Sequence, residues 1–216
     1  MNYNAIIFDF NGTLFFDTPL HIKAWDTISK QLNCGPITLD IIVKKYWGLK
    51  NIDLLKGLTD NAYSLEEYEL LSSQKEALYR SYVKEDPSYQ LASGVPEFFD
   101  YLKSTGIPFT IASASIKENI DFYIEHFHLD QWIDPSTIVY DDGNYPNKEE
   151  MYRQAIKNLN CALPVLVFED SSHGLKAAHN VKADVIAMDT PEVRDLHLDY
   201  IKAYIKDYQN IIKIID

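Results

Sequence analysis

Short apolar runs, each three or four residues long, recur along this chain and limit its possible folds more than any other feature. From residue 93 onward they alternate with stretches of helical periodicity. Such alternation is typical of a parallel sheet with helices on both faces. The sequence therefore predicts an α/β protein with a doubly wound parallel sheet. The expected strands are Ala5–Phe8, Phe109–Ala112, Ile138–Tyr140, Val165–Phe168 and Val185–Met188.

The segment between the first two runs has a different pattern. Residues 18–91 lack buried-strand runs and show helical periods instead, as at Leu20–Leu32 and Glu66–Val83. We therefore expect a core made of residues 1–17 and 92–216, interrupted by a cap of four or five helices.

The C-terminal stretch, roughly Leu196–Ile215, is amphipathic, with Tyr and Ile recurring along it. We expect its apolar stripe to cover the sheet, with a dimer interface as the alternative.

An acidic residue, Asp9, directly follows the first expected strand and precedes Phe10-Asn11-Gly12-Thr13. Open α/β sheets bind ligands beyond the carboxyl ends of their strands, where this carboxylate is expected. A turn that merely leaves the strand is the alternative reading of Asp9.

A second expected strand, Val165–Phe168, ends in the acidic pair Glu169-Asp170. Acidic pairs are common on solvated surfaces, but directly after a buried strand they need a cation, a basic side chain or water to compensate them. Carboxylates from two strand ends form a site of hard oxygen ligands. Such a site suits Mg²⁺.

Two further segments carry groups that can bind a phosphate. The strand Phe109–Ala112 runs into Ser113-Ala114-Ser115, where Ser113 and the following backbone N–H groups could bind phosphate oxygens. These serines could equally cap the helix expected over Lys117–Glu125. Lys148 precedes the helical pattern Met151–Leu159, and a lone Lys there is otherwise a solvated residue.

In this order the motifs resemble the haloacid dehalogenase superfamily: Asp-x-x-Gly-Thr, an apolar run ending in Ser, a Lys, and an apolar run ending in Glu-Asp. Within it the chain is most similar to the β-phosphoglucomutase-like phosphatases. His21-Ile22-Lys23-Ala24-Trp25 matches that group's sequence at the start of the cap, and Gly48–Leu55 resembles its cap loop. The resemblance covers nearly the whole chain and implies a Rossmann-like core with an inserted helical cap.

The resemblance implies a Mg²⁺ site and a nucleophile. Asp9 would take the phosphoryl group as an aspartyl-phosphate. Asp9, Asp170 and the backbone carbonyl of Asn11 would bind Mg²⁺. Glu169 would bind the metal directly or through water.

It also implies the groups that hold the substrate. Ser113 and Lys148 would bind the oxygens of the transferring phosphoryl group, where Mg²⁺ and Lys148 offset its repulsion from Asp9. Asp17 would cap the helix that follows it or order the hinge. The remaining substrate contacts would come from Gly12, Thr13, His21, Lys50, Asn51, Ala114 and Ser115.

Asn11 departs from the family pattern, in which a second Asp acts as general acid and base at this position. An amide cannot deliver a proton at neutral pH, and positioned acid–base catalysis contributes roughly 10²–10⁴ in rate. We therefore expect impaired hydrolysis of unactivated phosphate esters. Among relatives without this Asp, the dehalogenases have a Tyr at the position and cleave C–X bonds. The phosphonoacetaldehyde hydrolases have an Ala at the position and cleave C–P bonds with a Lys of the cap. In this chain Asn51 aligns with that cap Lys better than Lys50 does.

We therefore expect a Mg²⁺-dependent phosphatase or phosphotransferase acting on a small phosphorylated metabolite. A C–P or C–X bond hydrolase on the same scaffold is one alternative. A catalytically impaired phosphate-binding protein is another, and Asn11 favours it. Because Asn51 stands where the mutases carry an Arg, a mutase is less expected than a phosphatase.

The formal net charge of −12 argues against general nucleic-acid binding. Cys34 and Cys161 have no metal-like spacing and fall in different expected domains, which indicates reduced thiols. No run reaches membrane-spanning length, and the first strand leaves no room for a signal peptide. We expect a cytoplasmic monomer or weak homodimer without nucleic-acid or membrane partners.

Overall fold

The computed structural model describes residues 2–46, 49–194 and 196–215. Gly48, the first residue of the expected cap-loop match, lies outside the described residues. The chain forms two compact units, one of Met1–Phe16 with Gln90–Asp216 and one of Asp17–Tyr89. We call the first the sheet unit and the second the helical unit. That the helical unit acts as a cap stays a prediction.

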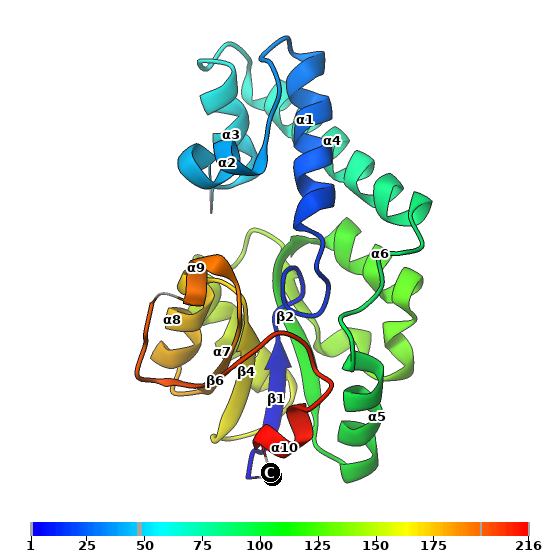
Figure 1. Cartoon of the computed structure of the whole chain (residues 1–216), viewed down its shortest axis with the longest axis vertical. Helices are drawn as coiled ribbons and strands as arrows, with labels where there is room; N and C mark the ends of the chain where they lie inside the picture. Colours follow the sequence, from blue (N-terminus) through cyan, green and yellow to red (C-terminus); the bar gives the residue numbers. More distant parts are fainter. Residues whose placement is uncertain (1, 47–48, 195, 216) are drawn as a thin grey trace. The chain divides into compact units, whose positions relative to one another are not determined.

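The sheet unit is built on a six-stranded sheet in the order β3-β2-β1-β4-β5-β6, in which every neighbouring pair is parallel (Figure 1). The strand order reverses beside β1, so the loops after β1 and its neighbours diverge there and leave room for a ligand. The strands are β1 Ala5–Phe8, β2 Phe109–Ile116, β3 Val139–Asp141, β4 Val165–Glu169, β5 Asp184–Met188 and β6 Ile201–Ile205.

Helices cover both faces of this sheet, as the expected α/β fold requires (Figure 1). The longer ones are α5 Val95–Thr105, α6 Lys117–Phe127, α7 Lys148–Asn158 and α8 Ser172–Asn180. The short ones are η2 Leu129–Gln131, η3 Pro135–Thr137, α9 Pro191–Arg194 and α10 Ile211–Ile215.

Alternate residues of β1 point to different layers, because side chains alternate across a strand. Ala5 and Ile7 belong to an aliphatic core shared with β4, β5, α7 and α8. Phe8 instead packs in an aromatic layer, stacked on Phe168 at 4.9 Å between ring centroids. The other rings around Phe8 are those of Phe98, Phe99, Phe109 and Tyr208. Both faces of β1 are therefore fully buried, which fixes the position of the loop that follows it.

The helical unit contains α1 Thr18–Gln31, α2 Leu39–Ile41, the π-helical turn η1 Ile42–Tyr46, α3 Asn51–Leu58 and α4 Leu65–Glu85. The start of α4 is fixed by a capping box between Ser64 and Glu67. Apolar residues of these helices, including Trp25, Ile28 and Leu55, form a separate core. The two expected helical periods therefore correspond to α1 and α4.

The expectation for the C-terminal stretch was wrong in part. Residues 201–205 form β6, a sixth strand paired with β5, rather than part of one long amphipathic element. Its burial alternates over Ile201, Ala203 and Ile205, the period of an edge strand. Tyr208, farther along, packs against Phe8 and so covers the sheet as expected.

In the part of the chain that the structure describes, no helix is both long enough and apolar enough to cross a membrane.

Candidate active site

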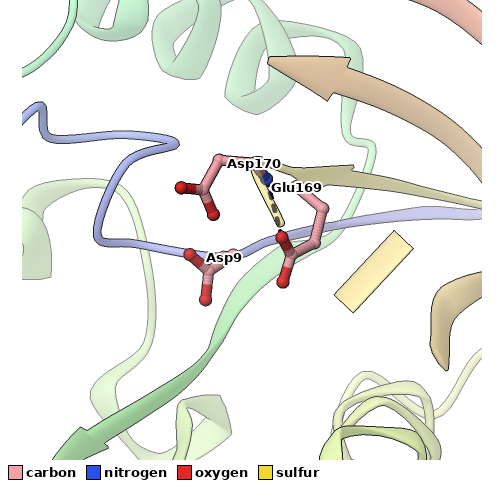
Figure 2. Close-up of side chains that lie close together, drawn as sticks. All are labelled: Asp9, Glu169 and Asp170. Atoms are coloured by element: carbon pink, nitrogen blue, oxygen red, sulfur yellow. Dashed lines mark hydrogen bonds between the residues drawn. The ribbon is translucent and has the colours of Figure 1, made fainter. Parts of the chain in front are cut away.

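Three carboxylates meet at the carboxyl ends of β1 and β4 (Figure 2). Asp9 directly follows β1, Glu169 is the last residue of β4, and Asp170 comes next. The strands are parallel neighbours, and the backbone N–H of Asp9 donates to Phe168 O at 3.0 Å. One oxygen of each carboxylate lies within 4.8 Å of those of the other two.

Lys148 supplies a positive charge among these groups. It is the first residue of α7, whose start is capped by the Asn147 side chain, which accepts from the N–H of Glu150. Its ammonium group donates to Asp9 Oδ1 and lies 3.5 Å from Glu169 Oε1. We call Asp9, Glu169, Asp170 and Lys148 together the acidic edge.

The acidic edge is buried and has more negative than positive charge, and both properties raise the pKa values of Asp9 and Asp170. Burial raises the pKa of Asp9 to about 7; Glu169 adds to the rise, and Lys148 opposes it. Burial and the neighbouring carboxylates also raise the pKa of Asp170 well above its usual value. Burial disfavours the ammonium of Lys148, but the attraction of Asp9 and Glu169 outweighs it and raises the pKa of Lys148.

Glu169 is held in one orientation by its own loop and by α7. Its Oε2 accepts from the backbone N–H of Asp170 at 2.6 Å and of Ser171 at 2.7 Å. Its Oε1 accepts from the Tyr152 hydroxyl at 3.2 Å. A side chain at Gly174 would collide with the Glu169 carboxylate, so Gly at this position lets α8 approach.

These residues fit a magnesium ion. The donors are hard carboxylate oxygens, which Mg²⁺ prefers, and three carboxylates lie here around the ammonium of Lys148. A divalent cation would relieve the excess of negative charge and favour the ionised carboxylates. Gly12, which has a φ of 76°, passes so close to Asp170 that an added Cβ would overlap its carboxylate.

The side chain of Asn11 lies between two hydroxyl groups. Ser115 Oγ donates to Asn11 Oδ1 at 2.6 Å, and Asn11 Nδ2 donates to the Tyr123 hydroxyl oxygen at 2.9 Å. Ser113 is buried, and its Oγ accepts from the backbone N–H of Ser115 at 3.2 Å. The alternative in which these serines cap α6 is wrong, because the cap residue is Ile116 and makes no side-chain cap hydrogen bond.

Three further predicted substrate contacts lie in the sheet unit. Gly12 is half-buried and Ala114 is exposed, and the backbone N–H of Gly12 donates to Phe15 O at 2.7 Å. Thr13 is fully buried, and its Oγ1 has no hydrogen-bond partner among the described residues. This burial does not favour direct contact between the Thr13 side chain and a substrate.

His21, Lys50 and Asn51 lie in the helical unit. Lys50 is exposed and precedes α3. Asn51 Nδ2 donates to Ser72 Oγ at 3.0 Å and to Glu76 Oε1 at 2.8 Å, so this amide ties α3 to α4.

His21 is half-buried and joins a group of buried polar residues that connects α1 and α4. Its Nδ1 accepts from the Lys75 ammonium at 2.7 Å, and its Nε2 lies 3.2 Å from Asp17 Oδ2. Its ring stacks on Tyr79, which donates to Asp17. Lys75 also donates to Glu76 at 2.7 Å. We call Asp17, His21, Lys75, Glu76 and Tyr79 the helical cluster.

The role expected for Asp17 as a helix cap was wrong. Asp17 occupies the N-cap position of α1, but its side chain makes no cap hydrogen bond and instead accepts from Tyr79. An ammonium group can only donate, so His21 Nδ1 accepts from Lys75 and Nε2 carries the hydrogen that faces Asp17.

Sequence reasoning missed three residues of the sheet-unit site. Tyr152 could have been found, because it lies four residues after Lys148 and so shares its helix face. Thr190, whose hydroxyl donates to Asp170 O at 3.1 Å, follows an expected strand end, as the other site residues do. Tyr123 had no local signal, because its contact with Asn11 spans 112 positions of the chain.

A family model described as haloacid dehalogenase-like hydrolase matches residues 6–188. The chain belongs to the haloacid dehalogenase-like hydrolases. The resemblance inferred from the motifs, the fold class and the hydrolase activity are thereby confirmed.

Individual members of the haloacid dehalogenase-like hydrolases are similar over most of their length. A phosphorylated carbohydrates phosphatase from Thermotoga maritima is 25% identical over 179 residues, 81% of this chain and 79% of the relative. The crystal structure of a family IA, variant 3 hydrolase from Entamoeba histolytica has a TM-score of 0.89 and 30% identity, and covers 98% of this chain and 97% of its own. A β-phosphoglucomutase from Clostridium difficile shares the fold, with a TM-score of 0.77 at 20% identity over 96% of this chain and 92% of its own.

Proposed function

We propose that this protein is a Mg²⁺-dependent phosphatase or phosphotransferase that acts on a small phosphorylated metabolite of the carbohydrate type. The observation that carries the proposal is the acidic edge, where a buried carboxylate bonded to Lys148 lies beside two more carboxylates. The phosphatase relative from Thermotoga maritima supports the substrate class.

Asp9 is the proposed nucleophile. One of its oxygens attacks phosphorus, the bond from phosphorus to the leaving oxygen breaks, and the phosphoryl group is held as an aspartyl-phosphate. Lys148 and the Ser113 hydroxyl hold the phosphoryl oxygens. Bound Mg²⁺ would supply positive charge that offsets the repulsion between the carboxylates and the phosphoryl group. Asp9, Asp170 and the carbonyl of Asn11 would hold it, with Glu169 directly or through water.

Asn11 limits which substrates react well. The leaving oxygen needs a proton when it departs from a sugar, and an amide cannot supply one. Aryl and acyl phosphates have leaving groups that need little protonation. The ratio of aryl-phosphate to sugar-phosphate turnover is therefore expected to be unusually high. The phosphorylated form of Asp9 is expected to accumulate, since its hydrolysis needs a base for water.

The proposal is tested by measuring phosphate release from a panel of aryl, acyl and sugar phosphates, with Mg²⁺ and with EDTA. We expect release that requires Mg²⁺ and is fastest for the aryl and acyl esters. Phosphate release that survives EDTA would contradict the metal-dependent mechanism, and cleavage of a C–X substrate that survives EDTA, in a parallel assay of halide release, would favour the C–X bond hydrolase. Binding of phosphate compounds without release of phosphate from any of them would favour the phosphate-binding alternative.

A further inference from the structure

Asn11 is followed by Gly12, the one Asn-Gly pair in the sequence. Such pairs are prone to deamidation because Gly leaves the next backbone nitrogen unhindered. That nitrogen attacks Cγ of the Asn, a C–N bond forms, and the side-chain nitrogen leaves as ammonia. Water then opens the resulting succinimide to aspartate or isoaspartate. At position 11 the aspartate product would carry the carboxyl group that the family pattern has there.

Every group in that reaction is engaged in the native fold. The attacking group, the backbone N–H of Gly12, donates to Phe15 O at 2.7 Å. The side-chain amide oxygen of Asn11, Oδ1, accepts from Ser115 Oγ. The side-chain nitrogen that would leave, Nδ2, donates to the Tyr123 hydroxyl. To bring Gly12 N onto Cγ, the side chain would have to rotate out of both hydroxyl contacts and the turn would have to open.

The two hydroxyl groups are themselves held by the fold. The Tyr123 ring is buried and stacks on Phe10 at 4.1 Å between centroids, with an interplanar angle of 15°. A second ring, that of Phe15, lies edge-on at 6.4 Å. Ser115 lies in β2, two residues after the buried Ser113.

We propose that Ser115 and Tyr123 are positioning residues whose hydrogen bonds to the Asn11 side chain, together called the lock, keep it as an amide. Asn11-Gly12 is then a latent modification site that deamidates only when these hydrogen bonds break. The role goes beyond the phosphatase reaction. It accounts for a group of side chains that neither binds the predicted metal nor supplies the nucleophile.

The experiment is an incubation of the folded protein at mildly alkaline pH, with the peptide that contains residue 11 followed by mass spectrometry for the amide-to-acid mass change. The same incubation in urea gives the rate of the unfolded chain. Three native hydrogen bonds oppose the reaction, each worth roughly a factor of five. We therefore expect native Asn11 to deamidate about 10²-fold more slowly than in urea.

Two variants open the lock and one serves as control. Tyr123→Phe and Ser115→Ala each remove one hydrogen bond and are expected to speed native deamidation about fivefold. Tyr204→Phe removes a hydroxyl from a residue that is 39% exposed on β6 and should leave the rate unchanged. The exposed pair Asp142-Gly143 isomerises through the same succinimide chemistry without a change of mass, and chromatographic separation of its aspartyl and isoaspartyl peptides gives an internal reference rate that should be equal in all four proteins.

Thermal unfolding of each variant separates opening of the lock from loss of the fold. If a variant unfolds during incubation, hydrogen exchange of the Asn11 side-chain amide is measured instead by NMR at lower temperature. Slow exchange in the wild-type protein and faster exchange in the variant support the proposal. Native wild-type protein that deamidates at the rate found in urea would overturn it. Folded variants with wild-type rates would overturn it too. None of these readouts uses enzyme activity, so they stand apart from the test of phosphate release.

Discussion

The acidic edge and the helical cluster both bury carboxylates beside a lysine, but their charges balance differently. In the acidic edge, Asp9, Glu169 and Asp170 share one ammonium group, that of Lys148. The pKa of Asp9 rises to about 7 and the pKa of Asp170 rises well above its usual value, with burial the main cause in both. Without a metal ion, this region is therefore less stable with Asp9 and Asp170 both ionised than with one of them protonated.

In the helical cluster, the two carboxylates lie among an ammonium, an imidazole and a phenol, and the charge of Arg80 also acts on Lys75. Lys75 bonds to both Glu76 and His21, while Asp17 accepts from Tyr79 and faces the imidazole. Burial lowers the pKa of Lys75, with Glu76 opposing that effect. The charged groups of the helical cluster form hydrogen bonds with one another and so hold α1 and α4 together. The acidic edge has an excess of carboxylates, which a bound cation would stabilise.

The largest expected effect comes from neutralising one carboxylate in each region. Asp9→Asn should reduce phosphate release at least roughly 10⁴-fold, because it removes the proposed nucleophile. Above pH 7 it should also stabilise the metal-free protein, since the raised pKa makes ionised Asp9 the less stable form. Asp17→Asn should lower the free energy of unfolding instead. Phosphate release and thermal unfolding without metal measure both. A loss of stability in Asp9→Asn equal to that in Asp17→Asn would show that the ionised carboxylate stabilises the fold in both regions, and would contradict the proposed difference between them.

The alternation of apolar runs and helices was enough to predict the parallel sheet, because a strand buried on both faces requires consecutive apolar residues. The edge strand β6 was missed since an edge strand carries only alternate apolar residues. In Ile201–Ile205 this pattern is short and merges with the Tyr and Ile residues that follow.

The acidic edge could be predicted because each of its residues directly follows a strand or precedes a helix that the pattern already located. The helical cluster could not. Lys75 and Glu76 lie in the middle of a helix and would ordinarily be solvated, and the contact of Lys75 with His21 spans 54 positions. Which charges become buried together depends on how α1 packs against α4, and local sequence does not specify this.

The next largest effect comes from adding one carboxylate to each region. Asn11→Asp should raise sugar-phosphate turnover by roughly 10²–10⁴, because it restores a general acid beside the nucleophile. Asn51→Asp places a carboxylate against Glu76, which now accepts from the Asn51 amide at 2.8 Å. It should cost more than about 1–3 kcal/mol of stability, because that is the typical cost of leaving a buried uncharged acceptor without its donor and the Glu76 carboxylate is charged.

Steady-state kinetics with fresh protein and denaturant unfolding measure these two changes. Asn144→Asp, in the exposed loop before α7, is the matched control for added charge. Unchanged rates in Asn11→Asp for every substrate would mean that residue 11 is not at the acid–base position.

Removing the lysine from each region tests whether Mg²⁺ distinguishes them. Lys75→Met should lower stability by about 3–5 kcal/mol, the usual result of breaking a buried ion pair from one side. Lys148→Met should also destabilise the metal-free protein, because Asp9 and Glu169 lose their counter-charge. Added Mg²⁺ should stabilise Lys75→Met as much as it stabilises the wild type, because the acidic edge is unchanged in that variant. It should stabilise Lys148→Met by more, because the cation there replaces the missing counter-charge of Asp9 and Glu169. A gain in Lys148→Met no larger than that of the wild type, in denaturant unfolding with Mg²⁺, would show that the cation does not act beside Lys148.

The smallest effect is the stabilisation of the wild-type protein by Mg²⁺ and its dependence on pH. At a free concentration about one hundred times its dissociation constant, a ligand that binds only the folded state adds about 2.7 kcal/mol of stability. Metal-free Asp9 has a pKa of about 7, raised above its unfolded value of 3.8, so the folded state binds more protons between those values. The stability of the metal-free protein should therefore fall as pH rises through this window. Protons compete with Mg²⁺ for the same oxygens, so the stabilisation by Mg²⁺ should be largest near pH 8 and fade as pH falls below about 7. Melting temperatures with Mg²⁺ and with EDTA across this range measure the stabilisation by Mg²⁺, and calorimetric titration gives the affinity.

Asp170→Asn should weaken Mg²⁺ binding and abolish activity, while Glu76→Gln, the matched change in the helical cluster, should leave Mg²⁺ binding intact. Equal Mg²⁺ affinity in Asp170→Asn and wild type would remove Asp170 from the metal site, and the excess charge of the acidic edge would then need another explanation.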